Sequence, residues 1–239
     1  MSDLFNEEII SQATHTKWAG KTVHFARETD STNLWGKRAW REEGAGHGEL
    51  FVAEYQSAGR GRFTRRWSAP PDSAITMSIG LEVGIKWPND VVVSRKKICG
   101  ILTEMTMKQD KIGCAVIGVG INVNMESFPE EMADKATSLY LESGHPFDRA
   151  QVVGLVMKHF EENYERFVQT EDLSGLKPDY EKMLANLNQP VRVLDQNDPY
   201  EGIARGINAG GELLVERADG TVEEVNSGEV SVRGLYSYV

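Results

Sequence analysis

Cysteine, histidine, basic charge and long apolar runs are all scarce in this chain of 239 residues. Two cysteines, Cys99 and Cys114, argue against a disulfide framework and favour reduced thiols and a cytoplasmic location. The five histidines show no metal-ligand spacing with each other or with the cysteines, so no metal site is predicted. A net charge of -10 argues against broad nucleic-acid binding, which needs a basic face.

Export and membrane signals are also lacking. The first ten residues are acidic and contain no apolar run of signal-peptide length. The longest apolar stretch, residues 114–123, is interrupted by glycines and is far shorter than the roughly 20 residues that span a bilayer. Neither a leader nor a membrane span is therefore expected, and the 40% apolar content suffices for one large domain with a small satellite.

Hydrophobic periodicity predicts an α+β domain over residues 1–188. A run of N-capping residues, Ser31 to Asn33, opens a helix that closes near Gly44. Apolar positions three and four apart predict a long helix from Asp148 to Val168, and a shorter one begins near Pro178 and ends near Leu187. Strands are expected at 23–25, 50–55, 91–93, 98–107 and 112–119. A mixed, largely antiparallel sheet flanked by helices is the simplest arrangement.

Residues 189–239 have a different character and predict a small all-β module. Short strands are expected at 191–194, 200–207, 212–216, 221–225 and 229–233, separated by turn sequences such as Asp219-Gly220. One stretch of the larger domain is anomalous, because residues 75–87 alternate in polarity far beyond the typical five or six residues of a strand. Either Gly80 or Gly84 hides a tight turn, or a segment has been removed.

Four arginines in an acidic chain gather in Gly59-Arg60-Gly61-Arg62-Phe63-Thr64-Arg65-Arg66-Trp67, here named the arginine loop. Glycines let the backbone approach a ligand, and guanidinium groups suit phosphate and carboxylate, so the loop predicts an anion site. Further along, Lys86-Trp87-Pro88-Asn89-Asp90 is typical of an active-site edge, although its last three residues alone are more often a turn. Gly118-Val119-Gly120 lacks the following helix of a dinucleotide fingerprint, which excludes a Rossmann interpretation.

Taken together, these segments resemble the bacterial biotin protein ligases. The resemblance runs from about residue 20 to the C-terminus and rests on motifs that occur in the family's order: Asp30-Ser31-Thr32-Asn33, Gln56 with the arginine loop, Lys86-Trp87-Pro88-Asn89-Asp90, Lys97-Ile98-Cys99-Gly100-Ile101-Leu102-Thr103-Glu104 and Gly118-Val119-Gly120-Ile121-Asn122. It implies the biotin/lipoate ligase fold, which is like that of class II aminoacyl-tRNA synthetases, with an SH3-like β-barrel at the C-terminus.

The resemblance also implies a two-step reaction. Biotin is activated by ATP, with Mg²⁺ accompanying the nucleotide, to biotinyl-5′-AMP and pyrophosphate, and a lysine of a biotin carboxyl carrier domain then accepts the biotin. No DNA partner is expected, because only some 20 residues precede the first strand, too few for the family's helix-turn-helix. A homodimer formed through the sheet is common in the family and is therefore a candidate assembly.

Residue roles follow from motif position alone. The catalytic candidates are Arg62, Lys97, Asp90 and Lys86, with Lys97 contacting phosphate and Asp90 orienting or deprotonating the acceptor lysine. The biotin ring would be held by Ser31, Thr32, Gln56 and Arg60, with room beside Gly100 and with Asn33, Gly59 and Gly61 near the ligand. Arg65 and Trp67 would close over the intermediate, Asn122 would meet the adenine, and Glu229 and Arg233 would lie near the nucleotide. For Thr32 and Asn33, helix capping is the alternative role, and for Trp67 the alternative is a place in the core.

The chain departs from the family at two places. The loop has Phe63-Thr64-Arg65 where Arg-Gly-Arg is usual, and about 30 residues including an apolar helix are expected near Ile79-Gly80 but are not in the sequence. A sequence that omits this segment is favoured over a true deletion, because losing a core helix exposes apolar area at about 25 cal/mol per Å². The rival functions are a lipoate or octanoate ligase on the same fold and a non-catalytic biotin-binding protein.

Overall fold

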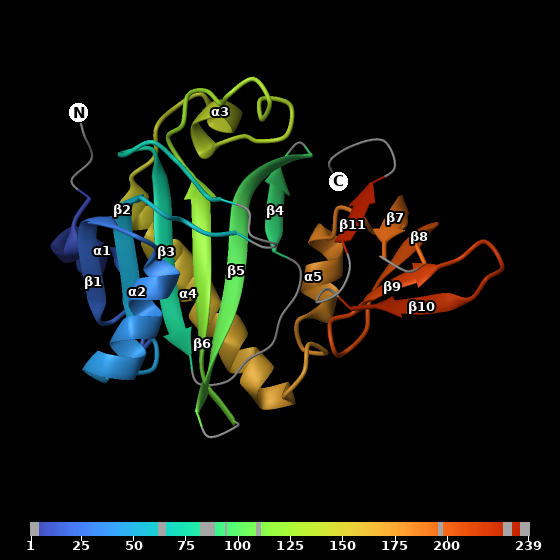
Figure 1. Ribbon diagram of the computed structural model, residues 1–239, viewed down its shortest axis with the longest axis horizontal. Helices are drawn as coiled ribbons and strands as arrows, with labels where there is room; N and C mark the ends of the chain where they lie inside the picture. Colours follow the sequence, from blue (N-terminus) through green and yellow to red (C-terminus); the bar gives the residue numbers. More distant parts are fainter. Residues whose placement is uncertain are drawn as a thin grey trace. The chain divides into compact units, whose positions relative to one another are not determined.

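The computed structural model describes residues 5–61, 66–81, 89–93, 95–108, 111–195, 198–226 and 231–234 (Figure 1). The chain divides into two compact units at Glu161 and Glu162. The first unit contains the chain up to Glu161, apart from the short pieces Lys86–Pro88 and Ser94–Lys96, which are grouped with the second.

Six strands form the sheet of the first unit in the order β1-β2-β3-β6-β5-β4. β1 runs parallel to β2, whereas the β2–β3, β3–β6 and β6–β5 pairs are antiparallel. The predicted mixed, largely antiparallel sheet is therefore confirmed. The strands are β1 (Val23–Thr29), β2 (Leu50–Gln56), β3 (Ala74–Leu81), β4 (Asp90–Val93), β5 (Lys96–Lys108) and β6 (Lys111–Asn122).

Helices cover the sheet as its alternating side chains require. On one face, Gly36 of α2 lies against Phe51 of β2 and Val116 of β6, within 3.5 Å of an added Cβ. On the other face, the Glu54 side chain bonds to Arg149 of α4, and Leu50 and Met157 of α4 both lie within 3.4 Å of a Cβ placed at Gly20. The helices of this unit are α1 (Glu7–Ala13), α2 (Thr32–Arg38) with its π-helical continuation η1 (Ala39–Glu43), α3 (Leu139–Ser143) and α4 (Arg149–Thr170), which continues into the second unit.

The predicted helices and strands are largely present. The helix that starts at Thr32 ends at Gly44 as expected, where a left-handed φ of 72° suits glycine. In the anomalous stretch 75–87, strand β3 covers Ala74–Leu81, and residues 82–88 lie outside the described part. Helix α5 (Lys177–Met183) ends before Leu187, because Leu184 is extended. Helices α1 and α3 were not predicted.

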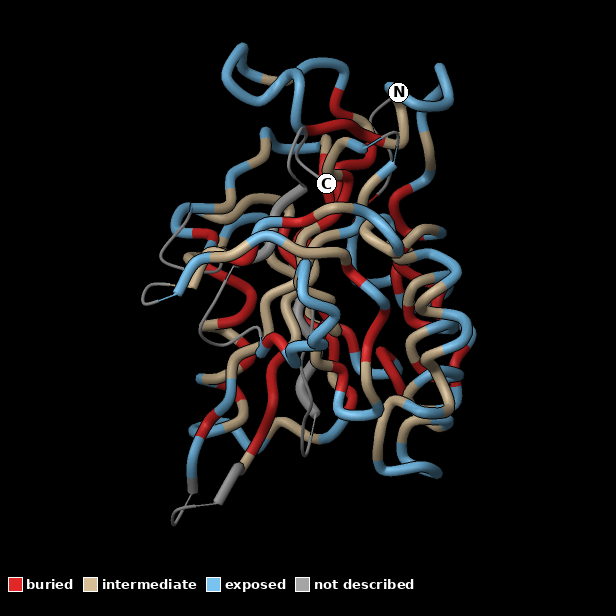
Figure 2. Tube along the Cα trace, turned by 90° about the vertical axis from the view of Figure 1, so that its right-hand side faces the viewer, coloured by how far each residue is buried: buried red, intermediate tan, exposed pale blue. Residues whose placement is uncertain are grey.

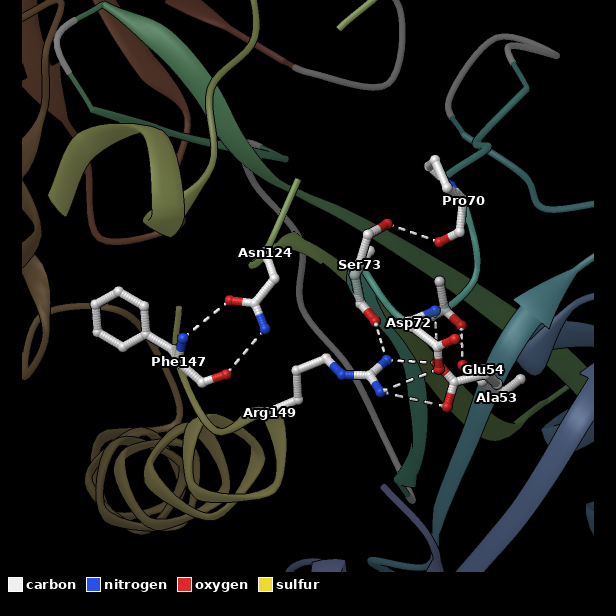
Figure 3. A network of polar contacts seen from close by, with 10 residues as sticks. Ala53, Glu54, Pro70, Asp72, Ser73, Asn124, Phe147 and Arg149 are labelled. Atoms are coloured by element: carbon white, nitrogen blue, oxygen red, sulfur yellow. Dashed lines mark hydrogen bonds and ion pairs between the residues drawn. The ribbon is translucent and has the colours of Figure 1, made fainter. Parts of the chain in front are cut away.

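A buried ion pair joins α4 to the sheet (Figure 3). The Arg149 guanidinium is fully buried, donates to Glu54 Oε1 of β2 at 2.5 Å and lies 4.2 Å from the Phe5 ring centroid. Its other end lies 3.7 Å from the exposed Asp72 carboxylate, and the Asp72 N–H donates to Glu54 at 2.9 Å. The network therefore fixes the chain where it enters β3.

The second unit contains an antiparallel sheet in the order β10-β9-β8-β7-β11, which agrees with the predicted β module. Its own core consists of buried side chains from these strands, with Tyr180 and Leu184 packed against it. Figure 2 colours the chain by burial, and along β7 and β9 every second residue is buried. The strands are β7 (Pro190–Leu194), β8 (Tyr200–Ile207), β9 (Leu213–Glu216), β10 (Val222–Val225) and β11 (Ser231–Gly234).

Candidate active site

The carboxyl ends of the parallel strands β1 and β2 bring the first predicted binding residues together. Thr29 pairs with Gln56 at these ends, and α2 begins three residues after Thr29. The Gln56 side-chain oxygen accepts hydrogen bonds from the Thr32 N–H at 2.7 Å and the Thr32 hydroxyl at 3.1 Å. Thr32 and Gln56 are thus neighbours, and Gln56 satisfies an N–H at the start of the helix that has no partner inside it.

Ser31 and Asp30 complete this corner. Ser31 is buried and occupies the predicted N-cap position of α2, but its hydroxyl makes no capping hydrogen bond to the helix. The Asp30 carboxylate instead accepts from the Ser31 N–H at 2.7 Å and pairs with Arg38 through two bonds of 2.7 and 3.0 Å. The bond from Arg38, aided by the Ser31 N–H and opposed by partial burial, lowers the pKa of Asp30 to about 2.

The base of the arginine loop is closed like a hairpin. Arg60 and Arg66 form an antiparallel bridge, and the Trp67 N–H donates to the Gly59 carbonyl at 3.0 Å. Any side chain at Gly59 would place its Cβ 2.5 Å from the Trp67 carbonyl oxygen, so this close approach requires glycine. Gly61 lies just inside the bridge, and Arg62 and Arg65 lie outside the described residues.

A partly buried carboxylate on β5 holds the loop base to the sheet. Glu104 Oε1 accepts from Arg60 at 2.9 Å and from Lys37 of α2 at 2.8 Å, and Glu104 Oε2 accepts from the Asn33 amide at 2.9 Å. Burial acts to raise the pKa of Glu104, but the bonds from Lys37 and Asn33 and the charges of Lys37 and Arg60 outweigh it and lower the pKa. We name these four residues the Glu104 cluster.

The Asn33 amide bonds within the Glu104 cluster and does not face open space. It is buried, donates a further bond to the Leu102 carbonyl at 3.3 Å, and lies so close to β6 that a Cβ at Gly118 would meet its Oδ1 at 2.1 Å. Its amide therefore ties α2 to the sheet. Sequence reasoning missed Glu104 as a functional residue, although a carboxylate inside an apolar strand, four residues after Gly100, was a visible signal.

Two glycines form a surface on which Trp67 rests. Gly100 of β5 pairs directly with Gly120 of β6, and we name this pair the glycine floor. A Cβ at Gly120 would lie 2.6 Å from the Trp67 ring, and one at Gly100 would lie 3.3 Å from it. The buried indole Nε1 has no hydrogen-bond partner. The structure thus brings Trp67 and Gly100 together as neighbours, with the indole seated on the sheet.

Lys97 and Asp90 meet at the edge of the glycine floor. The Lys97 ammonium lies 2.5 Å from the Asp90 carboxylate and 5.9 Å from the centroid of the Trp67 ring, and both members of the ion pair are largely buried. A Cβ at Gly100 would lie 3.0 Å from Lys97 Nζ, so the lysine side chain lies across this glycine. A cation, a carboxylate and an aromatic ring therefore converge beside the loop base.

Of the remaining predicted site residues, some lie in the part of the chain that the structure describes and others lie outside it. The buried Asn122 amide donates to the Thr137 carbonyl at 3.0 Å, which leaves its oxygen for any other contact. Burial raises the pKa of the nearby Cys99 thiol to about 12, so this cysteine is a protonated core residue. Lys86 and Glu229 lie outside the described residues, and of Arg233 the structure describes only the backbone, in β11.

The described residues contain neither a metal-ligand cluster nor a helix suited to crossing a membrane. In that part of the chain, no three His, Cys, Asp or Glu side chains converge as metal ligands would. None of its helices combines the length and the apolarity that a bilayer crossing demands.

Comparison with known proteins gives consistent matches. The profile of the Biotin/lipoate A/B protein ligase family matches residues 79–122, and that of the Biotin protein ligase C terminal domain matches residues 187–233. The Bifunctional ligase/repressor BirA of Bacillus spizizenii is 33% identical over 220 residues, which cover 79% of this chain and 67% of that protein. The Biotin--[acetyl-CoA-carboxylase] ligase of Mycobacterium tuberculosis is 30% identical and covers 77% and 78%.

A solved structure agrees in fold. The biotin protein ligase from Aquifex aeolicus in complex with biotin and ATP superposes with a TM-score of 0.76 at 29% identity, over 90% of this chain and 99% of that one. The alignment with the Bacillus protein runs over 220 positions, but it includes only 79% of the 239 residues of this chain, or about 189. About 30 positions of the relative therefore have no counterpart in this chain. That difference equals in size the segment expected near Ile79-Gly80, and the alignment does not give its position.

Proposed function

Because this chain belongs to the biotin protein ligase family, we propose that it is an ATP-dependent, AMP-forming ligase that biotinylates a carrier protein. In the first step, a biotin carboxylate oxygen attacks the α-phosphorus of ATP and pyrophosphate leaves. In the second, the neutral amine of a lysine on a biotin carboxyl carrier domain attacks the acyl carbonyl, and AMP leaves. The catalytic domain would be residues 1–188 and the β module 189–239, a boundary supported by the match that starts at residue 187.

The observation that carries the proposal is Lys97 at the edge of the glycine floor beside the base of the arginine loop. A fixed ammonium in a partly buried place stabilises charge that develops on phosphate oxygens without transferring a proton. Lys97 and Trp67 both lie within 3.3 Å of a Cβ placed at Gly100, so an extended acyl chain would pass between them only after these side chains move apart. Arg62, Arg65 and Lys86 would add positive charge in the roles that the resemblance implies.

Biotin itself would bind at the corner formed by β1, β2 and α2. Thr32 and Gln56 fix each other's orientation there, and Ser31 lies beside them. Because the Arg60 guanidinium is engaged by Glu104, Arg60 together with Gly59 and Gly61 would contact the ligand through the backbone. The Asn122 oxygen would accept from the adenine amino group.

Mg²⁺ fits this site as a companion of ATP. The described residues contain no cluster of acidic ligands, so the ATP phosphates would supply most of the ligands of Mg²⁺. Asp90, which pairs with Lys97, would be the carboxylate nearest to the phosphates. The ion would neutralise phosphate charge when bound. The cytoplasmic location stays a prediction that fits the two buried cysteine thiols, and a homodimer stays a candidate assembly.

Pyrophosphate exchange tests the first step. Purified, folded protein should catalyse biotin-dependent exchange between ATP and labelled pyrophosphate, and Lys97→Met should reduce the rate about 100-fold or more. Lys182→Met is the matched control, because this lysine is exposed on α5 and pairs only on the surface with Asp179. Absence of exchange by the wild-type protein, or equal exchange with lipoate, would contradict the proposal.

Asp90→Asn separates the two steps. If Asp90 deprotonates the acceptor lysine, transfer from preformed biotinyl-5′-AMP should fall about 100-fold while adenylate formation falls much less. The pairing with Lys97 offers the alternative that Asp90 only holds that ammonium in place, and both steps would then fall together. Single-turnover measurements of each step distinguish the two roles.

A further inference from the structure

The Glu104 cluster contains one more cation than is needed to offset the cost of burying the Glu104 carboxylate. Lys37 and Asn33, both on α2, already give Glu104 one ionic and one neutral partner at 2.8 and 2.9 Å. A carboxylate in this position is satisfied by such partners. Arg60 is a third donor, half exposed and 44 positions away in the chain, and it belongs to the loop rather than to α2.

The bond from Arg60 fixes the loop base at a defined place on the sheet. Glu104 lies on the same face of β5 as Gly100, four residues further, or about 13 Å along the strand. Because Arg60 is bridged to Arg66, and Gly59 to Trp67, a tether on Arg60 restrains both strands of the loop base. The Arg66 guanidinium adds a bond to the Ser57 carbonyl at 2.9 Å.

We propose that Glu104 is a positioning residue of the ligase, which binds the Arg60 side chain and so orders the base of the arginine loop before the ligand arrives. This role rests on the function proposed above. A loop base that is already ordered loses less conformational freedom when biotin and the adenylate bind. Glu104 acts through Arg60 and does not itself contact the reacting atoms.

Three variants and one control test this role. Glu104→Gln removes the charge, Arg60→Met removes the tethered side chain, and the double variant combines them. Lys37→Met is the control, since it removes the other cation from the same carboxylate oxygen and leaves the Arg60 bond in place. The readouts are the KM for biotin in pyrophosphate exchange, the rate of trypsin cleavage within the loop of ligand-free protein, and the unfolding temperature.

We expect Glu104→Gln to raise the KM for biotin about twofold to fivefold and to speed loop cleavage by a similar factor, as loss of a half-exposed ion pair allows. In the Arg60→Met background the same substitution should change neither quantity further. Lys37→Met should lower the unfolding temperature without faster loop cleavage. A purely structural role predicts equal effects of Glu104→Gln in both backgrounds, and that result would overturn the proposal.

These variants and readouts also test the role of Glu104 separately from the ligase function. If the wild-type protein shows no exchange, the ligase function fails, while trypsin cleavage still measures the tether. If Glu104→Gln does not fold, Arg60→Met still breaks the same bond from the half-exposed side. Loop cleavage of Arg60→Met at the wild-type rate would then refute the tether.

Discussion

Replacing Arg149 by methionine should destabilise the first unit more than any surface substitution. Methionine keeps much of the side-chain length but removes the guanidinium. The Glu54 carboxylate, whose side chain is 10% exposed, then loses its ionic partner at 2.5 Å and keeps the Asp72 N–H. The unpaired Glu54 charge is the largest cost of the substitution, because the hydration that this carboxylate loses on folding is no longer replaced by the bond from Arg149.

The magnitude follows from the contacts. Removing one partner of a buried ion pair costs about 3–5 kcal/mol. The contact of Arg149 with the Phe5 ring is included in that range, and the exposed Asp72 adds little because water screens it. For a unit of this size, about 2–4 °C of unfolding temperature corresponds to 1 kcal/mol, so the expected decrease is about 6–20 °C.

Thermal and urea unfolding, followed by circular dichroism, measure this effect. The matched control is Arg149→Met combined with Glu54→Leu, which removes both charges and should recover most of the loss, because an apolar pair can replace a buried ion pair. The double variant should also keep the KM for biotin, since Glu54 faces α4 while the site lies on the α2 face. A loss below about 1 kcal/mol in the single variant would refute the reasoning.

Two further predictions concern the site itself. Gly118→Ala should displace Asn33, whose Oδ1 would lie 2.1 Å from the new Cβ, lower stability by about 1–3 kcal/mol and raise the KM for biotin, whereas Gly46→Ala should do neither. Asp30→Asn should remove a stabilisation that is present above the ordinary pKa of 3.8 and lost as pH falls toward about 2. Because 41% of the Asp30 side chain is exposed beside Arg38, that effect should stay below about 1 kcal/mol, and a pH-independent difference in urea midpoints would contradict it.

Local periodicity was enough to predict most elements. The apolar positions of α4 recur at helical spacing because one face, with Val153 and Met157, is buried against the sheet. Gly44 ends its helix because the backbone there is left-handed. By contrast, α1 was missed, since seven residues capped by Asn6 give too short a pattern to recognise.

Long-range polar contacts were not predictable from the sequence. Periodicity says which residues share a face, but it does not say which charges meet across 44 to 95 positions, as Arg60 and Glu104 or Glu54 and Arg149 do. Motif position indicated Lys97 and Asp90 separately, and only the fold shows that they form one ion pair. The position of Trp67 on the glycine floor likewise depends on the pairing of β5 with β6.

The connection between β2 and β3 carries the arginine loop, and it is fixed from both faces of the sheet. On the α2 face, Glu104 binds Arg60. On the α4 face, Glu54 and Arg149 hold Asp72 where the connection enters β3, and the Ser73 carbonyl accepts from the Asn124 N–H at 2.8 Å. Both described ends of the loop, at Arg60 and at Arg66, are therefore held to the same sheet that carries Lys97 and Asp90.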